Sequence, residues 1–351
     1  MTDRIAVAMS GGVDSAIAAY LLMKSYDEVT GVTMQHFDAT SSNYPHPESI
    51  AEDIRDAARV CAALSLEHRI VDVRIEFRKK IIDYFISEYA RGSTPNPCTL
   101  CNPVIKWGIL WDELQDQGFS RFATGHYVKK QERGRSCYLK RAKDREKDQS
   151  YMLWGLTREQ VASTIFPNGN YKKAYIRSLA RKLDLPVHDK GDSQEICFIK
   201  GHYEEFLREH ITMQPGDIVD LSGKIIGKHR GLPLYTVGQR KGLHTPWKSA
   251  LYVMKLDMAD NCLVVTDNEN DLYDNKFTAG DLNWTSGDPP RPQTGITVQV
   301  RYNSNPVAVS KLIFHDSQLE VILDKAVRAI TPGQSAVFYD QDRLLGGGII
   351  K

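Results

Sequence analysis

The stretch AMSGGVDSAIAAYLLM, residues 8–23, follows a short apolar run at residues 4–7 and has the pattern of a helix start. The first turn of a helix leaves backbone N–H groups without partners and carries partial positive charge, which suits a bound anion. Glycines in such a turn let the backbone approach a ligand closely. The stretch therefore predicts a strand, an anion-binding turn and a helix.

The turn itself, Ser10–Ser15, reads SGGVDS. A Walker A loop, GxxxxGK[ST], needs a lysine to reach the terminal phosphates of a nucleotide, and this turn has none. Its composition resembles instead the PP-loop of the ATP pyrophosphatase families, which cleave ATP to AMP and pyrophosphate. The simpler alternative is an ordinary turn in which Ser10 caps the helix.

Length and composition limit the class of protein. At 351 residues the chain is longer than a domain with a single hydrophobic core normally is, so we expect two or three domains. Its 42% hydrophobic and 25% charged residues are typical of a soluble globular protein. No apolar stretch is long enough for a bilayer, and the start MTDRIAV lacks the layout of a signal peptide, so we expect a cytoplasmic protein without membrane contact.

The charge distribution is uneven although the formal net charge is only +1. Residues 121–149 hold ten Lys/Arg against four Asp/Glu, and residues 171–190 hold six against two. Clustered basic segments can bind a polyanion even in a nearly neutral chain. A solvated basic surface is the alternative interpretation.

The first two hundred residues alternate between apolar runs and helical patterns. This alternation predicts an α/β domain whose parallel sheet carries helices on both faces. The predicted strands lie at residues 5–9, 29–34, 70–73 and 122–124. Ligands of such sheets bind at the carboxyl ends of the strands, where the Ser10–Ser15 turn lies.

After about residue 205 the pattern changes to short alternating runs, such as residues 296–302, broken by Gly, Pro, Asn and Asp. A boundary near Asp274–Ala279 and the Pro/Gly-rich stretch 285–295 indicate two units there. We therefore expect three domains: a parallel-sheet domain over 1–204, a small central β-rich domain over 205–274 and a β-barrel-like domain over 275–351.

Three of the six cysteines lie in segments of unusual composition. Cys98 and Cys101 form a Cys-x-x-Cys pair after two prolines in STPNPCTLCNPVIKWG, and Cys197 lies in GDSQEICFIKG. Such a pair alone is compatible with a redox dithiol, half of a zinc site, or chance. Structural zinc is disfavoured because no second CxxC or HxxxH pair occurs. The other cysteines, 61, 137 and 262, are expected to be inert side chains.

Seven blocks in the chain together resemble the tRNA-specific 2-thiouridylase (MnmA) family, in the family's order. They are Ser10–Ser15, Pro95–Asn102, Ala123–Tyr127, Lys147–Tyr151, Asp192–Phe198, Tyr235–Gly242 and Thr331–Ser335. The resemblance implies ATP-dependent thiolation of the wobble uridine in the tRNAs for lysine, glutamate and glutamine, with Mg²⁺ beside ATP. The uracil 2-oxygen would be adenylated, and sulfur from a cysteine persulfide would displace AMP. The implied sulfur donor is a relay protein or a cysteine desulfurase, and a monomer is expected.

The resemblance also implies roles for individual residues. The ATP-binding set is Ala8, Met9, Ser10, Gly11, Gly12, Val13, Asp14, Ser15, Met34 and Gly125. The residues facing the target base are Asn96, Pro97 and Cys98, and the catalytic cysteines are Cys101, Cys197 and Cys98. The tRNA-binding set is His126, Lys147, Asp148, Gln149, Arg301, Tyr302 and Gln334.

In the same account Cys197 carries the persulfide, and attack by Cys101 frees sulfide and leaves a Cys101–Cys197 disulfide. Because the thiolate is the reactive form of cysteine, we expect both residues in electropositive, partly exposed surroundings.

The chain departs from the family at Cys98, where many relatives have aspartate. Cysteine is less acidic, with an ordinary pKa of about 8.5 against about 3.9, so a general-base role is in doubt. Cys98 could pair reversibly with Cys101, or Cys98, Cys101 and Cys197 could hold a [4Fe-4S] cluster with one open iron. The segment after Met34 also lacks the asparagine-tryptophan pair associated with the family.

Three other functions are compatible with parts of the sequence. An amide-forming PP-loop synthetase would not need the cysteine set, so Cys197→Ser would leave its turnover intact. An RNA-binding module with a vestigial nucleotide turn would bind tRNA with a steep salt dependence and release no pyrophosphate. A dithiol redox protein would act without ATP.

Overall fold

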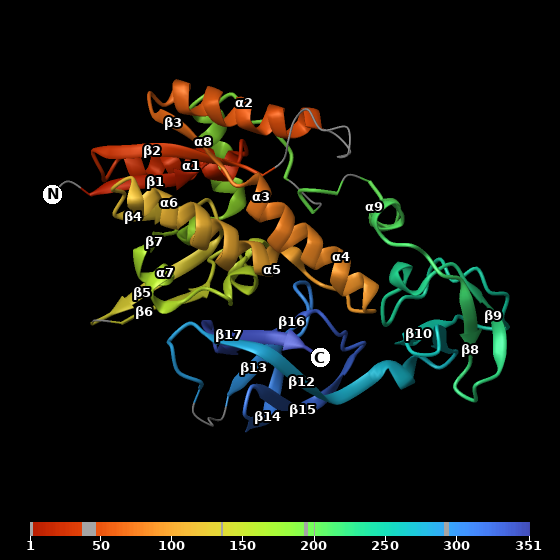
Figure 1. Cartoon of the computed structure of the whole chain (residues 1–351). Coiled ribbons are helices and arrows are strands. Elements are labelled where there is room, and N and C mark those ends of the chain that lie inside the picture. Colours follow the sequence, from red (N-terminus) through yellow and green to blue (C-terminus); the bar gives the residue numbers. More distant parts are fainter. Residues whose placement is uncertain (1–2, 37–46, 135, 193–195, 200, 291–294) are drawn as a thin grey trace.

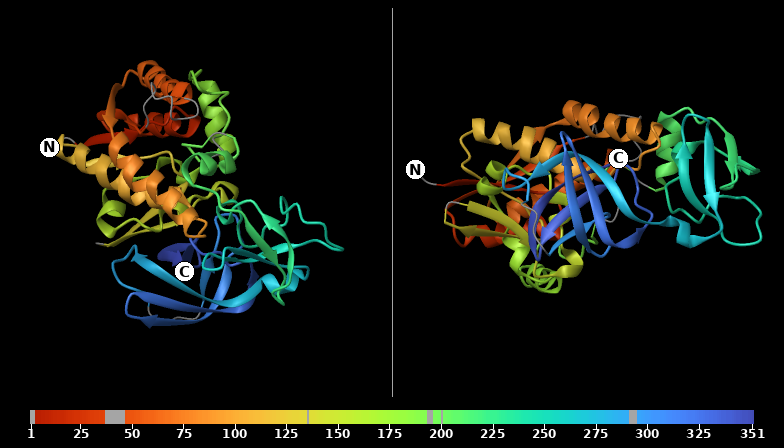
Figure 2. Two further views of the ribbon diagram at one scale, coloured as in Figure 1. Left: turned by 45° about the vertical axis from the view of Figure 1, so that its right-hand side comes forward. Right: turned by 90° about the horizontal axis from the view of Figure 1, so that it is seen from below.

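The computed structural model describes residues 3–36, 47–134, 136–192, 196–199, 201–290 and 295–351. Figure 1 shows an N-terminal region in which helices pack on a sheet, a C-terminal barrel below it, and a central β region beside both. The views in Figure 2 place the central region at one end of the molecule. No helix in the described ranges is both long and apolar enough to cross a membrane.

The N-terminal sheet has five parallel strands in the order β3-β2-β1-β4-β7. Their bounds are β1 (Arg4–Ala8), β2 (Glu28–Gln35), β3 (Glu67–Asp72), β4 (Arg121–Ala123) and β7 (Thr164–Ile165). The four predicted apolar runs correspond to β1 through β4, which confirms the parallel α/β sheet. The two-residue strand β7 is too short to give a periodic signal in the sequence.

Helices cover both faces of this sheet because successive side chains of a strand point in opposite directions. Ile5 and Val7 of β1 pack on one face, whereas Ala6 belongs to the core on the other face. The first core is covered by α1 (Val13–Met23), α2 (Pro47–Ala63) and α8 (Lys173–Lys182). The second is covered by α6 (Leu110–Asp116) and α7 (Arg158–Ser163).

A further helical layer leads to the predicted cysteine segment. It contains α3 (Arg74–Phe77), α4 (Asp83–Ala90) and α5 (Pro97–Cys101). A π-helical stretch, Asn102–Ile109, joins α5 to α6 without a break. Helix α9 (Tyr203–His210) packs on α4 and leads into the central region.

The central region is a four-stranded sheet in the order β10-β11-β8-β9. Its strands are β8 (Gly216–Val219), β9 (Ile225–His229), β10 (Tyr252–Asp257) and β11 (Cys262–Thr266). Leu263 and Val265 of β11 enter a small core of their own, separate from the cores of the N-terminal sheet. This confirms the small β-rich unit that the sequence predicts.

The C-terminal region is a closed antiparallel barrel. Strand β12 pairs with both β15 and β17, which joins the two ends of the strand order β12-β15-β14-β13-β16-β17. The bounds are β12 (Tyr273–Trp284), β13 (Ile296–Gln299), β14 (Val307–His315), β15 (Gln318–Arg328), β16 (Ser335–Asp340) and β17 (Arg343–Ile350). The barrel-like domain of the fold prediction is thereby confirmed.

One of the two sequence signals for a boundary, Asp274–Ala279, lies in the long strand β12, the first strand of the barrel. The other, the Pro/Gly-rich stretch 285–295, lies between β12 and β13 in the chain and so does not separate two units. Strand β12 bends through register shifts and pairs with two neighbours in turn, so its alternation is interrupted although the strand continues.

The N-terminal region and the barrel share structure. A hairpin of the N-terminal region, β5 (Val128–Arg133) and β6 (Ser136–Arg141), extends the barrel sheet because Lys140 pairs with Arg343 of β17. Tyr339 and Leu344 of the barrel belong to the same buried core as Ala6 of β1.

Candidate active site

The turn after β1 lies where the strand order reverses. The chain builds β2 and β3 on one side of β1 and then places β4 on the other, and ligands of open α/β sheets bind at such a point. The N-cap of α1 is Gly12, and no side chain caps this helix. The interpretation of Ser10 as the cap is therefore wrong: its hydroxyl lies 3.3 Å from that of Ser15. The first N–H groups of α1 are available to an anion.

Close packing explains two of the glycines. Gly11 has φ +69°, and a Cβ there would lie 2.3 Å from the carbonyl oxygen of Asp53 in α2. A Cβ at Gly125 would lie 2.8 Å from the backbone of Asp14. The Asn168 amide ties these segments together by donating to the carbonyl oxygens of Asp14 and Gly125 at 2.9 and 3.0 Å. The backbone segments after β1 and β4 thus pack directly against each other. Asn168, which holds them together, is a residue that the sequence analysis missed.

Charged side chains surround Asp14, on the first turn of α1. Lys173, the first residue of α8, donates to both Asp14 oxygens at 2.7 Å, and the Tyr127 hydroxyl donates to Oδ1 at 2.7 Å. Burial and the neighbouring Asp14 charge raise the pKa of Tyr127, so its hydroxyl stays protonated. Neither Tyr127 nor Lys173 carries a sequence signal for this role.

Lys173 also links Asp14 to Asp192, at 2.8 Å. Lys147 and Arg177 contact the same Asp192 carboxylate at 2.9 and 2.6 Å. Burial raises the pKa of Asp192, but the hydrogen bonds from Lys173 and Lys147 outweigh it and hold the pKa below its usual range. We call these five residues the Asp14–Asp192 cluster; its two carboxylates and three cations leave one positive charge beside the start of α1.

Much of the basic excess in residues 171–190 is used inside the protein. Lys173 and Arg177 belong to the Asp14–Asp192 cluster, and Lys190 contacts Asp53 and Asp56 of α2 at 2.7 and 2.6 Å. The composition of this segment therefore overstates the positive charge that it offers to a polyanion.

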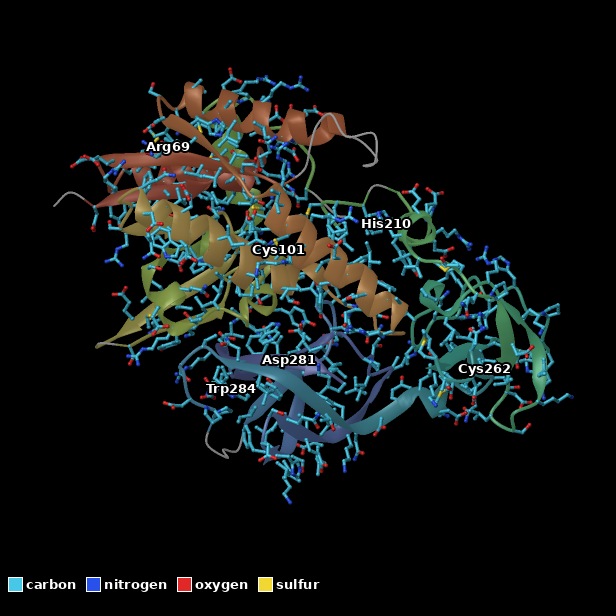
Figure 3. All side chains as sticks on the ribbon, in the orientation of Figure 1. Arg69, Cys101, His210, Cys262, Asp281 and Trp284 are labelled. Atoms are coloured by element: carbon cyan, nitrogen blue, oxygen red, sulfur yellow. The ribbon has the colours of Figure 1, made fainter. Side chains whose placement is uncertain are left out.

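The cysteine segment forms a short helix at the edge of an aromatic core. The side chain of Asn96 caps α5 by accepting from the Cys98 N–H at 3.1 Å, and Pro97 is the first helical residue. Cys98 and Cys197 have exposed surface, whereas Cys101 is buried. All three are free thiols. Figure 3 shows Cys101 among the helices of the N-terminal region, away from Cys262 in the central region.

The three thiols influence one another, so the structure brings them together. Protein atoms around the sulfurs disfavour the thiolate: burial raises the pKa of Cys101 to about 11 and also raises the pKa of Cys98 and Cys197. The charges of Cys101 and Cys98 raise the pKa of Cys197 further, and Lys106 opposes the shift at all three thiols. The electropositive surroundings expected for Cys101 and Cys197 are therefore not found, and the expected partial exposure holds for Cys197 but not for Cys101.

The structure explains this by packing. Cys101 belongs to a buried cluster with Phe77, Phe85 and Phe198, and Phe198 directly follows Cys197. The charge of Lys106 alone does not compensate for this apolar environment. Within the described ranges no three His, Cys, Asp or Glu side chains are arranged to hold a metal ion, and a [4Fe-4S] cluster on Cys98, Cys101 and Cys197 stays a prediction. Residues 37–46, which include most of the segment after Met34, lie outside those ranges.

Three family models together match nearly the whole chain. Residues 3–201 match a family model described as a tRNA methyl transferase HUP domain. Residues 204–267 match a tRNA methyl transferase PRC-barrel domain, and residues 274–350 match an aminomethyltransferase beta-barrel domain.

Curated relatives match along their full length. The tRNA-specific 2-thiouridylase MnmA of Trichlorobacter lovleyi is 42% identical over 353 residues, 99% of this chain and 98% of the relative. The protein of the same name from Synechocystis is 42% identical over 355 residues, 100% of this chain and 97% of the relative. The chain belongs to the MnmA family.

Among solved structures, a U34-tRNA thiolase NcsA from Methanococcus maripaludis with its [4Fe-4S] cluster aligns with 59% of this chain and 65% of its own, at 18% identity and a TM-score of 0.36. At that score the alignment supports no argument about this member of the MnmA family.

The side chains assigned to tRNA from the family pattern are mostly engaged within the protein. Burial and the charge of Lys106 lower the pKa of His126, so its ring is neutral. Asp148 is buried and accepts from the backbone of Ala142 at 2.7 Å, while Gln149 accepts from the Tyr127 N–H at 2.9 Å.

The remaining members of that set bridge regions of the molecule. The Tyr302 hydroxyl donates to the carbonyl oxygen of Asp148 at 3.2 Å, which brings the barrel next to the Lys147–Gln149 segment. Arg301 donates to the carbonyl oxygens of Val237 and Ala329 and to the Thr331 hydroxyl. These contacts supply structural roles, and contact with tRNA stays a prediction for each residue.

Proposed function

We propose that this protein catalyses ATP-dependent 2-thiolation of the wobble uridine in the tRNAs for lysine, glutamate and glutamine. The observation that carries the proposal is the full-length relation to 2-thiouridylases of the MnmA family, at 42% identity. Three features support it: an uncapped helix start at a strand-order reversal, a surplus positive charge beside it, and three neighbouring thiols.

The first half-reaction joins the uracil 2-oxygen to AMP. The α1 start and the turn Ser10–Ser15 would hold the phosphates, and the surplus charge of the Asp14–Asp192 cluster would favour the triphosphate and the departing pyrophosphate. Met34 and Gly125, at the ends of β2 and β4, would border the nucleoside. Lys173 already occupies both Asp14 oxygens, so Mg²⁺ would be held mainly by the phosphates.

The second half-reaction delivers sulfur. Cys197 would receive a persulfide from a relay protein or a cysteine desulfurase. The Cys101 thiolate would attack the inner sulfur, forming the Cys101–Cys197 disulfide and releasing HS⁻. That sulfide would displace AMP from C2 of the uridine, and a dithiol reductant would return both cysteines to thiols.

The RNA would approach across the region where the barrel meets the N-terminal region. Asn96, Pro97 and Cys98 would face the target base, with Cys98 at the exposed side of α5. The barrel, residues 275–351, would assist tRNA binding, and the protein would act as a monomer. Base-modifying enzymes generally take the target base out of its stack. The free-energy cost of this step is small for an anticodon base, because that base is unpaired.

The direct test is to incubate the protein with ATP, sulfide and unmodified tRNA and to detect oxygen-to-sulfur exchange at the wobble nucleoside by mass spectrometry. Asp14→Asn should reduce the exchange at least a hundredfold. Cys101→Ser and Cys197→Ser should each do so when a protein persulfide replaces sulfide as the donor. Cys262→Ser, which changes a thiol in the central region, is the matched control and should retain full activity. Thiolation at full rate without ATP would contradict the proposal.

A further inference from the structure

The backbone that leads into the cysteine helix is held by the C-terminal barrel. Thr94 lies four residues before Cys98, and both of its peptide groups bond to one turn of the barrel. The Thr94 N–H donates to the carbonyl oxygen of Pro332 at 2.8 Å, and the Gln334 amide donates to the Thr94 carbonyl oxygen at 2.7 Å. The partners are 240 residues apart in sequence.

The same turn fits closely against the loop. Gly333 has φ +90°, and a Cβ there would lie 2.8 Å from the Thr94 nitrogen. Ser335 donates to the hydroxyl of Thr99, the residue after Cys98, at 3.3 Å. The turn Thr331–Ser335 therefore contacts the chain on both sides of Cys98.

The turn is itself firmly anchored. The Gly333 N–H donates to the carbonyl oxygen of Ile350 at 2.9 Å, and the Ile350 N–H donates to the carbonyl oxygen of Gln334 at 2.9 Å. Arg301 binds Thr331 from the neighbouring loop. Because its own backbone is bonded to the last strand of the barrel, the turn can act as a fixed support.

We propose that Gln334 is a positioning residue that sets the place of Cys98 and Cys101 through Thr94, rather than mainly a contact for tRNA. One N–H of its amide already donates to the Thr94 carbonyl oxygen at 2.7 Å, which ties this side chain to the loop that leads into α5. This inference rests on the proposed function for the role of the cysteines, but its test needs neither ATP nor RNA.

The test is the rate at which iodoacetamide alkylates Cys98, followed by peptide mass spectrometry. Gln334→Met removes the donor to Thr94 at similar volume, so loss of one hydrogen bond should loosen α5 and speed Cys98 labelling about three- to tenfold. Gln318→Met makes the same change at an exposed glutamine of the same barrel and should leave the rate unchanged. Cys61, fully buried in the N-terminal core, should stay unlabelled and so report an intact fold.

Two further measurements separate positioning from RNA contact. In Gln334→Met, kcat for thiolation should fall about three- to tenfold while the Kd for tRNA stays within twofold. A raised tRNA Kd with wild-type Cys98 labelling would overturn the inference and leave the proposed function intact. If the Gln334→Met variant shows altered Cys98 labelling but the wild-type protein thiolates no tRNA, the proposed function fails and the inference about Gln334 stands.

A second variant guards against a general loss of folding. Gln334→Asn keeps the amide but shortens the side chain, so it no longer reaches the Thr94 carbonyl, and it should repeat the result of Gln334→Met. If in both variants Cys98 labelling rises only together with Cys61 labelling, the turn supports the whole fold and the inference fails.

Discussion

The turn after β1 and the cysteine helix α5 are built in opposite ways. The turn Ser10–Ser15 is contiguous, follows one strand, and is shaped by Gly11, whose neighbour Asp53 leaves no room for a side chain. The cysteine helix α5 depends on Gln334, which comes from the far end of the chain. The first region can therefore be recognised from local sequence, whereas the geometry of the second depends on how the regions pack together.

The electrostatic surroundings differ as well. Asp14 and its neighbours keep several ion pairs and one surplus positive charge, while the thiols lie against Phe77, Phe85 and Phe198. The surplus positive charge beside Ser10–Ser15 favours a bound anion, whereas the apolar surroundings of the thiols disfavour the thiolate form. The protonated thiols are therefore favoured over the thiolates.

The largest effect is expected from Lys173→Met. Its side chain is only 11% exposed, and its ammonium separates the carboxylates of Asp14 and Asp192, which would then face each other. We expect a loss of about 2 to 3 kcal/mol in the free energy of unfolding, less than for a fully buried pair because both carboxylates are partly exposed. Urea unfolding measures it, with Lys182→Met on the exposed side of the same helix as the control.

The same variant should release no pyrophosphate, whereas alkylation of Cys98 should stay as in the wild type. A protein with normal stability and normal pyrophosphate release would show that the Asp14–Asp192 cluster does not support the nucleotide turn.

A smaller effect should follow Gly11→Ala. The added Cβ would meet the Asp53 carbonyl at 2.3 Å in a backbone conformation with φ +69°, so α2 must move away from the turn. We expect ATP to bind at least tenfold more weakly, measured by calorimetry. Gly223→Ala also forces a positive φ, +83°, but its Cβ would meet open space, so it controls for backbone strain alone. Equal ATP affinity in both variants would contradict a tight turn.

The smallest effect concerns pH. Because the pKa of Cys101 is about 11, its alkylation rate should rise about tenfold per pH unit from pH 7 to 9, without a plateau in that range. Lys106→Met removes a charge that lowers this pKa, so the rate at any pH in that range should fall several-fold. Lys79→Met, an exposed lysine of the same region, is the control. A plateau near pH 8 would show that Cys101 has an ordinary thiol pKa.

The sequence could predict what depends on local pattern. The strand, turn and helix around Gly11 and Gly12 follow from periodicity and glycine placement, and the β character after residue 205 follows from alternation. The environment of Cys101 could not be predicted, because its aromatic neighbours come from α3, α4 and the segment after Cys197. Lys173 was counted only as part of a basic segment, since nothing in the sequence shows that Asp14 and Asp192 share it.

The pairing of β6 with β17 has a consequence for the autonomy of the catalytic region. Val337, Tyr339 and Leu344 of the barrel complete a core that also contains Ala6 and Trp107. A fragment that stops at residue 204 would expose the apolar side chains of this core to water. It would also leave the β6 edge of the β5–β6 hairpin without its partner strand. The N-terminal region therefore depends on the barrel for part of its hydrophobic core, and the two regions should fold as one unit.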